Sequence, residues 1–275
     1  MSTNAKFERS VRAKRKLYGN VVQFIVLYGS LIWGERLSKV KSLQRPLRQV
    51  QRLVAVRIIA KYRTVAYDIA ILLARTPPWT LLSEKYMETY WRIKQHILDG
   101  TLDRATEKRI RKEEDDSLMT KWKNSIRQSP TIAGSNNPAR RAICEHLEEW
   151  LNRNHGAINY RVTQMLSGHG CFRAFLHKIG KEDNSNCLQC VGSSSWNAKE
   201  DTANHTMVEC LAWHAEREQL LATMKCQLTW RNIISEICQN KDKWKSVNSY
   251  VQTVIKQRKS SRELGKDRDI LMIEE

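Results

Sequence analysis

Three cysteines and one histidine in the second half of the chain have the types and spacing of metal ligands. Two residues separate Cys187 from Cys190, and fourteen residues later four residues separate His205 from Cys210. Thiolate and imidazole groups are ligands that Zn²⁺ prefers, and two such pairs complete a tetrahedral site. Four protein ligands leave no open position for water or substrate. The pattern therefore predicts one structural zinc ion and not a catalytic metal.

Other uses of these residues stay open from the sequence. They could be reduced core cysteines beside an incidental histidine, although the segment between the two pairs is polar. A redox Cys-x-x-Cys fits less well, because no strand precedes it and no helix clearly follows it. His214 could replace His205 as a ligand, and His169 with Cys171 could belong to a second site.

The composition predicts that helices position these ligands. The chain has 275 residues, 41% of them hydrophobic, with only 11 glycines and 5 prolines, which indicates a folded, mainly α protein. Pro46 suits the first turn of a helix, and Leu47, Val50, Val54 and Ile58 follow it at helical spacing on one face.

Four regions are expected along the chain. Residues 1–128 form a basic helical region with connecting helices, and the Pro, Gly, Ser and Asn residues of 129–140 form a linker. Residues 141–240 form a helical module that contains the zinc motif. Residues 241–275 are polar and basic, and we expect a weakly ordered tail there.

Positive charge is concentrated at the N-terminal end. The formal net charge is +18, and residues 1–66 hold fifteen Lys or Arg against two acids, a net +13. Such an excess favours a polyanionic partner, first of all RNA or DNA. The candidate phosphate contacts are Arg45, Arg48, Arg52, Arg57, Lys61 and Arg63. The alternative is an ordinary solvated helix face.

Two apolar stretches are predicted to be buried. One is VVQFIVLYGSLIW (21–33), with a break near Gly29 or Gly34, although an apolar face in residues 1–66 could also be exposed. The other is a stripe of Leu82, Tyr86 and Tyr90 with Ile93 or Ile97. These tyrosines could stack on bases, but a stripe at helical spacing more often belongs to a core.

The sequence argues against a membrane or secreted protein. No run approaches the roughly 18 to 20 apolar residues that cross a bilayer, and no convincing cleavage site follows the basic N-terminus. Seven cysteines, an odd number at uneven spacing, indicate reduced thiols. We expect an intracellular protein, nuclear or cytoplasmic.

Several phrases in order carry a resemblance to a known family. They are LYGSLIWGERL, RQVQRLVAVRIIAKYRT, ARTPPW, QMLSGHGCFRAFLHKIGKE and the CCHC motif ending in HTMVEC, followed by AWHAERE. Together they resemble the C-terminal portion of reverse transcriptases (RNA-directed DNA polymerases) from non-LTR retrotransposons, a class of transposable element. The resemblance covers roughly residues 15–220. It implies that residues up to about 66 follow the polymerase palm as a thumb-like helical element, and that the CCHC zinc motif helps to engage RNA or target DNA.

The resemblance also implies that the catalytic half of the polymerase is missing. Polymerase chemistry needs paired aspartates for two metal ions. The only adjacent pair, Asp115-Asp116, lies in a highly charged stretch without apolar flanks. We therefore expect a catalytically inactive fragment whose natural partner is the absent palm and fingers. The alternative is a zinc-stabilised protein-interaction module that does not bind nucleic acid.

Overall fold

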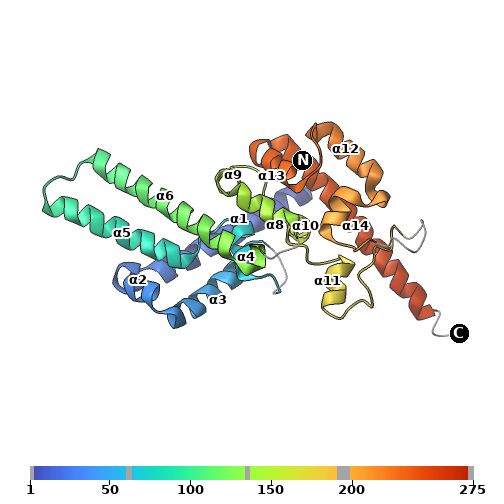
Figure 1. Cartoon of the computed structure of the whole chain (residues 1–275), viewed down its shortest axis with the longest axis horizontal. Coiled ribbons are helices and arrows are strands. Elements are labelled where there is room, and N and C mark those ends of the chain that lie inside the picture. Colours follow the sequence, from blue (N-terminus) through green and yellow to red (C-terminus); the bar gives the residue numbers. More distant parts are fainter. Residues whose placement is uncertain (1–2, 60–63, 134–136, 191–198, 272–275) are drawn as a thin grey trace. The chain divides into compact units, whose positions relative to one another are not determined.

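The computed structural model describes the backbone of residues 3–59, 64–133, 137–190 and 199–271, and side chains from residue 13 to residue 260 of these ranges except residue 133. The described elements are helices, and no strand is formed among them apart from a single bridge between Asn186 and Glu200 (Figure 1). The predicted mainly α fold is confirmed. The chain divides into two compact units, Met1–Gly134 and Ser135–Glu275, and this division falls within the expected 129–140 linker.

The first unit contains seven helices among its described residues. They are α1 (Thr3–Leu27), α2 (Ser30–Lys39), α3 (Lys41–Ile58), α4 (Tyr67–Ala74), α5 (Trp79–Leu98), α6 (Arg104–Gln128) and α7 (Pro130–Ala133). Gly29 adopts a φ of 72° between α1 and α2, a left-handed conformation that suits glycine, so the predicted helix break is confirmed.

A buried glutamine ties three helices of this unit together. The Gln51 side chain on α3 donates to the Pro77 carbonyl at 2.7 Å and accepts from the Tyr67 hydroxyl at 2.6 Å and the Trp79 backbone N–H at 2.9 Å. The indole of Trp79 is buried in a cluster with Leu27, Val54, Leu82 and Leu118. From the apolar pattern of α3 alone, a glutamine at this position would be expected at the surface. It is buried because its side-chain amide makes these three hydrogen bonds.

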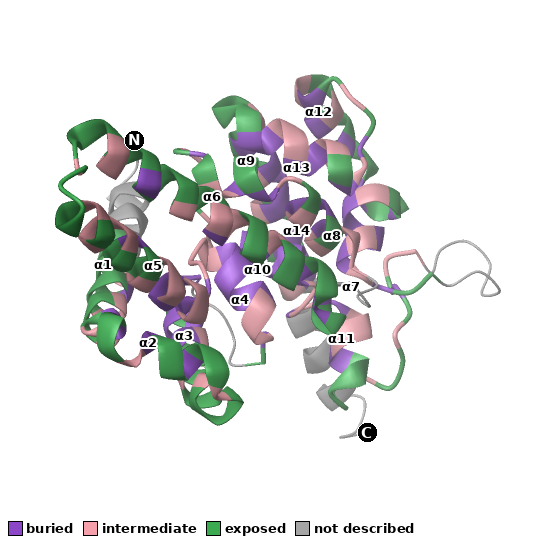
Figure 2. Cartoon of the chain, turned by 60° about the vertical axis from the view of Figure 1, so that its left-hand side comes forward, coloured by how far each residue is buried: buried purple, intermediate pink, exposed green. Residues whose placement is uncertain are grey.

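Both apolar stretches that were predicted to be buried are buried only in part: Leu27 and Leu82 lie in the core cluster, whereas other members are exposed. In the first, the exposed fractions of Phe24, Tyr28 and Ile32 are 70%, 77% and 89%. In the second, Tyr86 and Tyr90 retain 38% and 41% exposure. The physical reason is that α5 packs mainly against α2 and α6, with smaller contacts to α3 and α1, and the side chains that face away from these helices stay exposed (Figure 2).

The second unit holds the predicted metal ligands. Its described elements are α8 (Pro138–Glu145), α9 (Leu147–Asn152), α10 (Tyr160–Ser167), α11 (Arg173–Lys178), a π-helix η2 (His205–Glu209), a short 3₁₀ helix η3 (Leu211–Trp213), α12 (His214–Met224), α13 (Trp230–Gln239) and α14 (Lys241–Leu271). Helices α8, α10 and α13 pack with α14 around buried residues that include Trp150, Met165, Ile233 and Val251.

The expectation of a weakly ordered tail at 241–275 is wrong for most of that segment. Residues Lys241–Leu271 form one helix. Trp244, Val247, Val251 and Val254 are buried, which anchors the first half of α14 in the core of the second unit. The helix forms because these apolar residues recur at three- and four-residue steps despite the polar composition around them.

Candidate metal centre

The structure brings the four predicted ligands together. One ligand atom from each of Cys187, Cys190, His205 and Cys210 lies within 4.8 Å of all the others. The Cys190 Sγ lies 3.3 Å from His205 Nε2 and 3.5 Å from Cys210 Sγ, and the sulfurs of Cys187 and Cys210 are 3.9 Å apart. The side chains form a buried or half-buried set of three sulfurs and one nitrogen that could bind a metal ion.

A tight turn positions the first ligand pair. The backbone N–H of Cys190 donates to the Cys187 carbonyl at 3.4 Å, and the Cys187 N–H donates to the Lys199 carbonyl at 2.9 Å. The bridge between Asn186 and Glu200 holds the two ends of this loop together. Residues 191–198, at the middle of the loop, lie outside the described residues.

A π-helix explains the spacing of the second pair. In the π-helix, the backbone N–H of Cys210 donates to the carbonyl of His205, five residues earlier, at 2.8 Å. This i to i+5 bond aims both side chains at the same point, where an α-helical turn would place i and i+4 together. The turn begins where the Thr202 hydroxyl accepts the His205 N–H at 3.0 Å.

A carboxylate lies behind the histidine ligand. His205 Nδ1, the nitrogen that faces away from the sulfurs, is 3.6 Å from the Glu209 carboxylate. Lys199 and Asn204 donate to Glu209 at 3.1 and 3.0 Å, and the hydrogen bond from Lys199 lowers the pKa of Glu209. A charged carboxylate in this place fixes the orientation of a metal-bound imidazole.

The helices of the second unit support the ligand loop directly. The buried Tyr250 hydroxyl on α14 donates to the Thr206 carbonyl in the π-helix at 2.9 Å. The Trp230 indole N–H on α13 donates to the Asn204 side chain at 3.0 Å. The π-helix is therefore held by residues far away in the sequence.

Asp201, between the two ligand pairs, is a buried anchor. Its carboxylate accepts the Arg173 backbone N–H at 2.9 Å at the start of α11 and forms an ion pair with Arg258 of α14. Its backbone N–H donates to the Ser185 carbonyl at 2.8 Å. With exposed fractions of 1% and 7%, Asp201 and Arg258 depend on each other for charge compensation.

The cluster stabilises one thiolate, that of Cys187. The hydrogen bond from Cys210 is the main cause that lowers the pKa of Cys187 to about 3, and burial opposes it. The pKa of Cys210 is raised, because its thiol donates to Cys187 and is buried. The negative charge of Cys187 also raises the pKa of His205 through a side-chain hydrogen bond. A site that already stabilises one thiolate is suited to a cation.

The other candidate ligands lie outside the cluster. His214 is exposed at the start of α12 and lies 3.7 Å from Glu218. The Nδ1 atom of His169 is 2.9 Å from the Ser167 carbonyl, and its ring packs edge-on against Phe175 at 4.6 Å. Neither His169 nor Cys171 belongs to the described cluster.

The proposed phosphate contacts occupy different environments in the first unit. Arg45 is exposed, and Arg48 lies 3.5 Å from Asp68 and over the Tyr67 ring. Arg52 donates to the Val65 carbonyl at 2.8 Å, and Arg57 donates to the Tyr18 hydroxyl at 3.4 Å. Lys61 and Arg63 lie outside the described residues. The structure thus gives three of the arginines intramolecular contacts.

Sequence reasoning missed the residues that support the ligands. Glu209 could have been found, because it lies four residues after a predicted ligand. Asp201, Trp230 and Tyr250 carry no local signal, since their partners are 57, 26 and 44 residues away.

The comparisons with known proteins add no relative. No protein-family model, no curated protein and no solved structure matches the chain. Among the described residues no single helix is long and apolar enough to cross a membrane. The segments Ala13–Leu27 and Ser30–Lys39, which meet at a bend of 83°, together reach the length and apolar composition of such a helix.

Proposed function

We propose that the chain is the C-terminal part of a non-LTR retrotransposon reverse transcriptase, which binds nucleic acid and holds a structural zinc ion at the CCHC cluster. The observation that carries this proposal is the closed set of four ligands, Cys187, Cys190, His205 and Cys210, inside a chain with a net charge of +18. The ordered sequence phrases supply the family.

The atomic separations support zinc as the ion. With Zn–S bonds of about 2.3 Å and Zn–N bonds of about 2.0 Å, a tetrahedral site places sulfurs about 3.8 Å apart and nitrogen about 3.5 Å from sulfur. Three of the six separations within the cluster, 3.9, 3.5 and 3.3 Å, are close to these values, and all six are within 4.8 Å. Four protein ligands fill the coordination shell, so the ion would join the loop at 187–190 to the π-helix at 205–209 without taking part in chemistry.

The charge distribution supports nucleic acid as the partner. Residues 1–66 carry a net +13, and the side chains of Arg45 and Arg57 on α3 are exposed. Arg48 remains half-exposed beside Asp68 and could exchange that contact for a phosphate. Contacts of this kind release counterions, which makes binding strongly dependent on salt.

The acidic residues support binding without polymerase activity. Asp115 and Asp116 are exposed on α6, and Asp115 forms an ion pair with Lys85 on α5. A pair of neighbouring residues on a charged helix surface does not provide the buried, converging carboxylates that hold two catalytic metal ions. We propose that the palm and fingers of a complete polymerase are the natural partners of this chain.

Binding of labelled RNA and single-stranded DNA, measured by fluorescence anisotropy over a series of salt concentrations, tests the proposal. We expect log K to fall linearly with log salt, with a slope of about −0.7 for each phosphate neutralised on a single strand. Absence of binding at low salt, or an affinity that salt does not change, would refute the nucleic-acid function.

A zinc-stabilised protein-interaction module is the second candidate. It is favoured by the exposed apolar side chains of α1 and α2, such as Phe24, Tyr28 and Ile32. Patches of this kind mark interaction surfaces. This candidate predicts a metal-containing protein that does not bind RNA or DNA in the same titration.

A further inference from the structure

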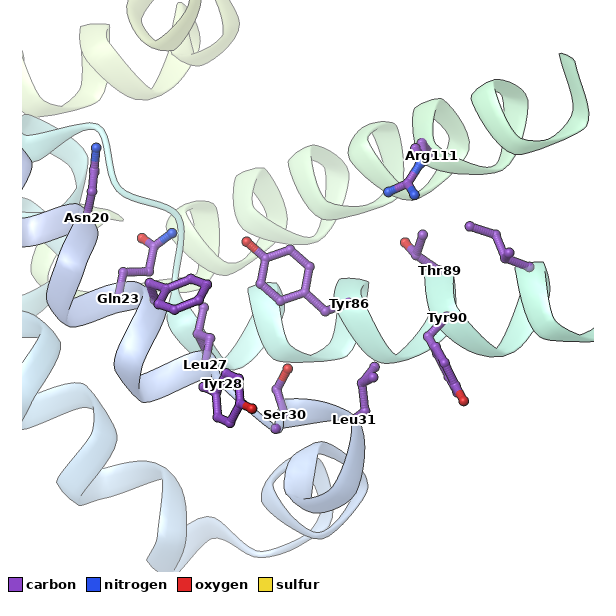
Figure 3. Close-up of a pocket in the computed structure, with 13 residues that line it drawn as sticks. Asn20, Gln23, Leu27, Tyr28, Ser30, Leu31, Tyr86, Thr89, Tyr90 and Arg111 are labelled. Atoms are coloured by element: carbon purple, nitrogen blue, oxygen red, sulfur yellow. The ribbon is translucent and has the colours of Figure 1, made fainter. Parts of the chain in front are cut away.

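A groove in the first unit is lined by aromatic side chains from separate helices. It has a volume of about 740 Å³, within the range of roughly 300 to 1,000 Å³ usual for ligand sites, and lies among α1, the α1–α2 turn, α5 and α6. Figure 3 shows Tyr28 at the turn, Tyr86 and Tyr90 on α5, and Arg111 on α6 around it.

The aromatic side chains along this groove are partly exposed to solvent. Phe24 near the end of α1 and Tyr28 in the following turn have ring centroids 6.2 Å apart, and both are more than two-thirds exposed. On α5, Tyr86 and Tyr90 are four residues apart. Exposed rings that repeat in this way offer stacking surfaces that accept any base.

The lining also contains polar and charged groups suited to nucleotides. Asn20 on α1 brings an amide that both donates and accepts hydrogen bonds, as base edges require. Arg111 brings a guanidinium, which forms an ion pair with Glu107 at 2.7 Å. Beside the lining, Lys94 on α5 lies over the rings of Tyr90 and Trp91, at 5.8 and 4.9 Å from their centroids. A groove that binds an apolar protein helix would have a continuous apolar floor, which these side chains interrupt.

The face of α1 that lines the groove continues into a cationic segment. Lys16, Asn20 and Phe24 follow one another at four-residue steps and so share one side of the helix. Lys16 is exposed one turn before the groove, about 6 Å along the axis from Asn20. A phosphate could contact this lysine while the attached base enters the groove.

We propose that this groove binds the unpaired nucleotides of a single-stranded nucleic acid, with bases stacked on Tyr86, Tyr90, Phe24 or Tyr28 and phosphates near Lys16. This inference rests on the proposed nucleic-acid function and adds to it the site and the preference for single strands. A duplex keeps its base faces stacked inside and gains nothing from the rings.

The test compares oligo(dT) with a DNA duplex of equal length, using the full chain and two double variants. Y86L/Y90L removes the rings but keeps apolar bulk, whereas Y86F/Y90F keeps the rings and removes only the hydroxyl groups. We expect Y86L/Y90L to bind oligo(dT) roughly tenfold or more weakly while its duplex affinity is unchanged. Y86F/Y90F should bind both as the wild type does.

The outcomes separate this inference from the proposed function. If the wild type binds neither probe at low salt, the nucleic-acid function itself fails. If the wild type binds with the expected salt dependence but Y86L/Y90L binds oligo(dT) equally well, the groove inference fails, and a protein partner becomes the better occupant.

A second measurement does not depend on the folding of variants. Photocrosslinking of the wild-type chain to a 5-iodouracil oligonucleotide, followed by mass spectrometry, should label peptides that contain Tyr28, Tyr86 or Tyr90. Crosslinks confined to residues 135–275 would overturn the inference.

Discussion

Replacing Arg258 with methionine should strongly destabilise the second unit. Arg258 on α14 forms an ion pair with Asp201, and both residues are almost wholly buried. Without the guanidinium, the Asp201 carboxylate keeps the Arg173 backbone N–H at 2.9 Å but no compensating charge. Removing one partner of a buried ion pair typically costs 3–5 kcal/mol, so we expect a loss of about 4 kcal/mol in the free energy of unfolding.

The assay is chemical denaturation of the full chain followed by circular dichroism. In a thermal melt, a loss of this size lowers the melting temperature by roughly 14 °C for a unit of about 140 residues. The matched control is Lys256→Met on the exposed side of the same helix, which should change stability by less than about 0.5 kcal/mol.

A double variant shows whether charge is the cause. Arg258→Met combined with Asp201→Asn removes both charges, and we expect it to be more stable than Arg258→Met alone. If Arg258→Met costs no more than Lys256→Met, Asp201 does not depend on α14 and the reasoning is wrong.

Two further predictions concern the support of the ligand loop. Burial raises the pKa of Tyr250 to about 12, so the protonated phenol stabilises the fold fully below about pH 10, and this contribution of about 3 kcal/mol is lost as pH rises through 12. The free energy of unfolding of Tyr250→Phe should therefore fall less steeply than that of the wild type between about pH 10 and 12. The same pH dependence in both proteins would contradict the assignment. Glu209→Gln removes the charge behind His205 and should weaken zinc affinity about 10- to 100-fold in competition with a chelator, with Glu218→Gln as the control on α12; equal affinities in the two variants would show that Glu209 does not orient the ligand.

The ligand set and one helix break could be predicted from local patterns. The spacing of one Cys-x2-Cys pair followed by one His-x4-Cys pair is typical of metal ligands. The structure places all four side chains together. The break at Gly29 follows from the backbone freedom of a single residue. The first-turn position predicted for Pro46 is wrong, because α3 begins at Lys41 and Pro46 lies inside the helix.

Burial could not be predicted in the same way. The stripe of Tyr86 and Tyr90 shows which side chains share a face of α5, but the periodicity contains no information on what covers that face. In α14 the signal was present, since Trp244, Val247 and Val251 recur at helical spacing, but the polar composition outweighed it. Contacts such as Arg258 to Asp201 join residues that only the tertiary fold brings together.

The central claim, a structural zinc ion held by Cys187, Cys190, His205 and Cys210, is tested most directly by metal content and X-ray absorption of the purified chain. The account predicts one zinc ion per chain with three sulfur neighbours and one nitrogen neighbour, its loss in Cys190→Ser and His205→Ala, and its retention in Cys226→Ser, which changes a half-buried cysteine outside the cluster. A wild-type chain without zinc, or a full zinc content in Cys190→Ser and His205→Ala, would contradict it.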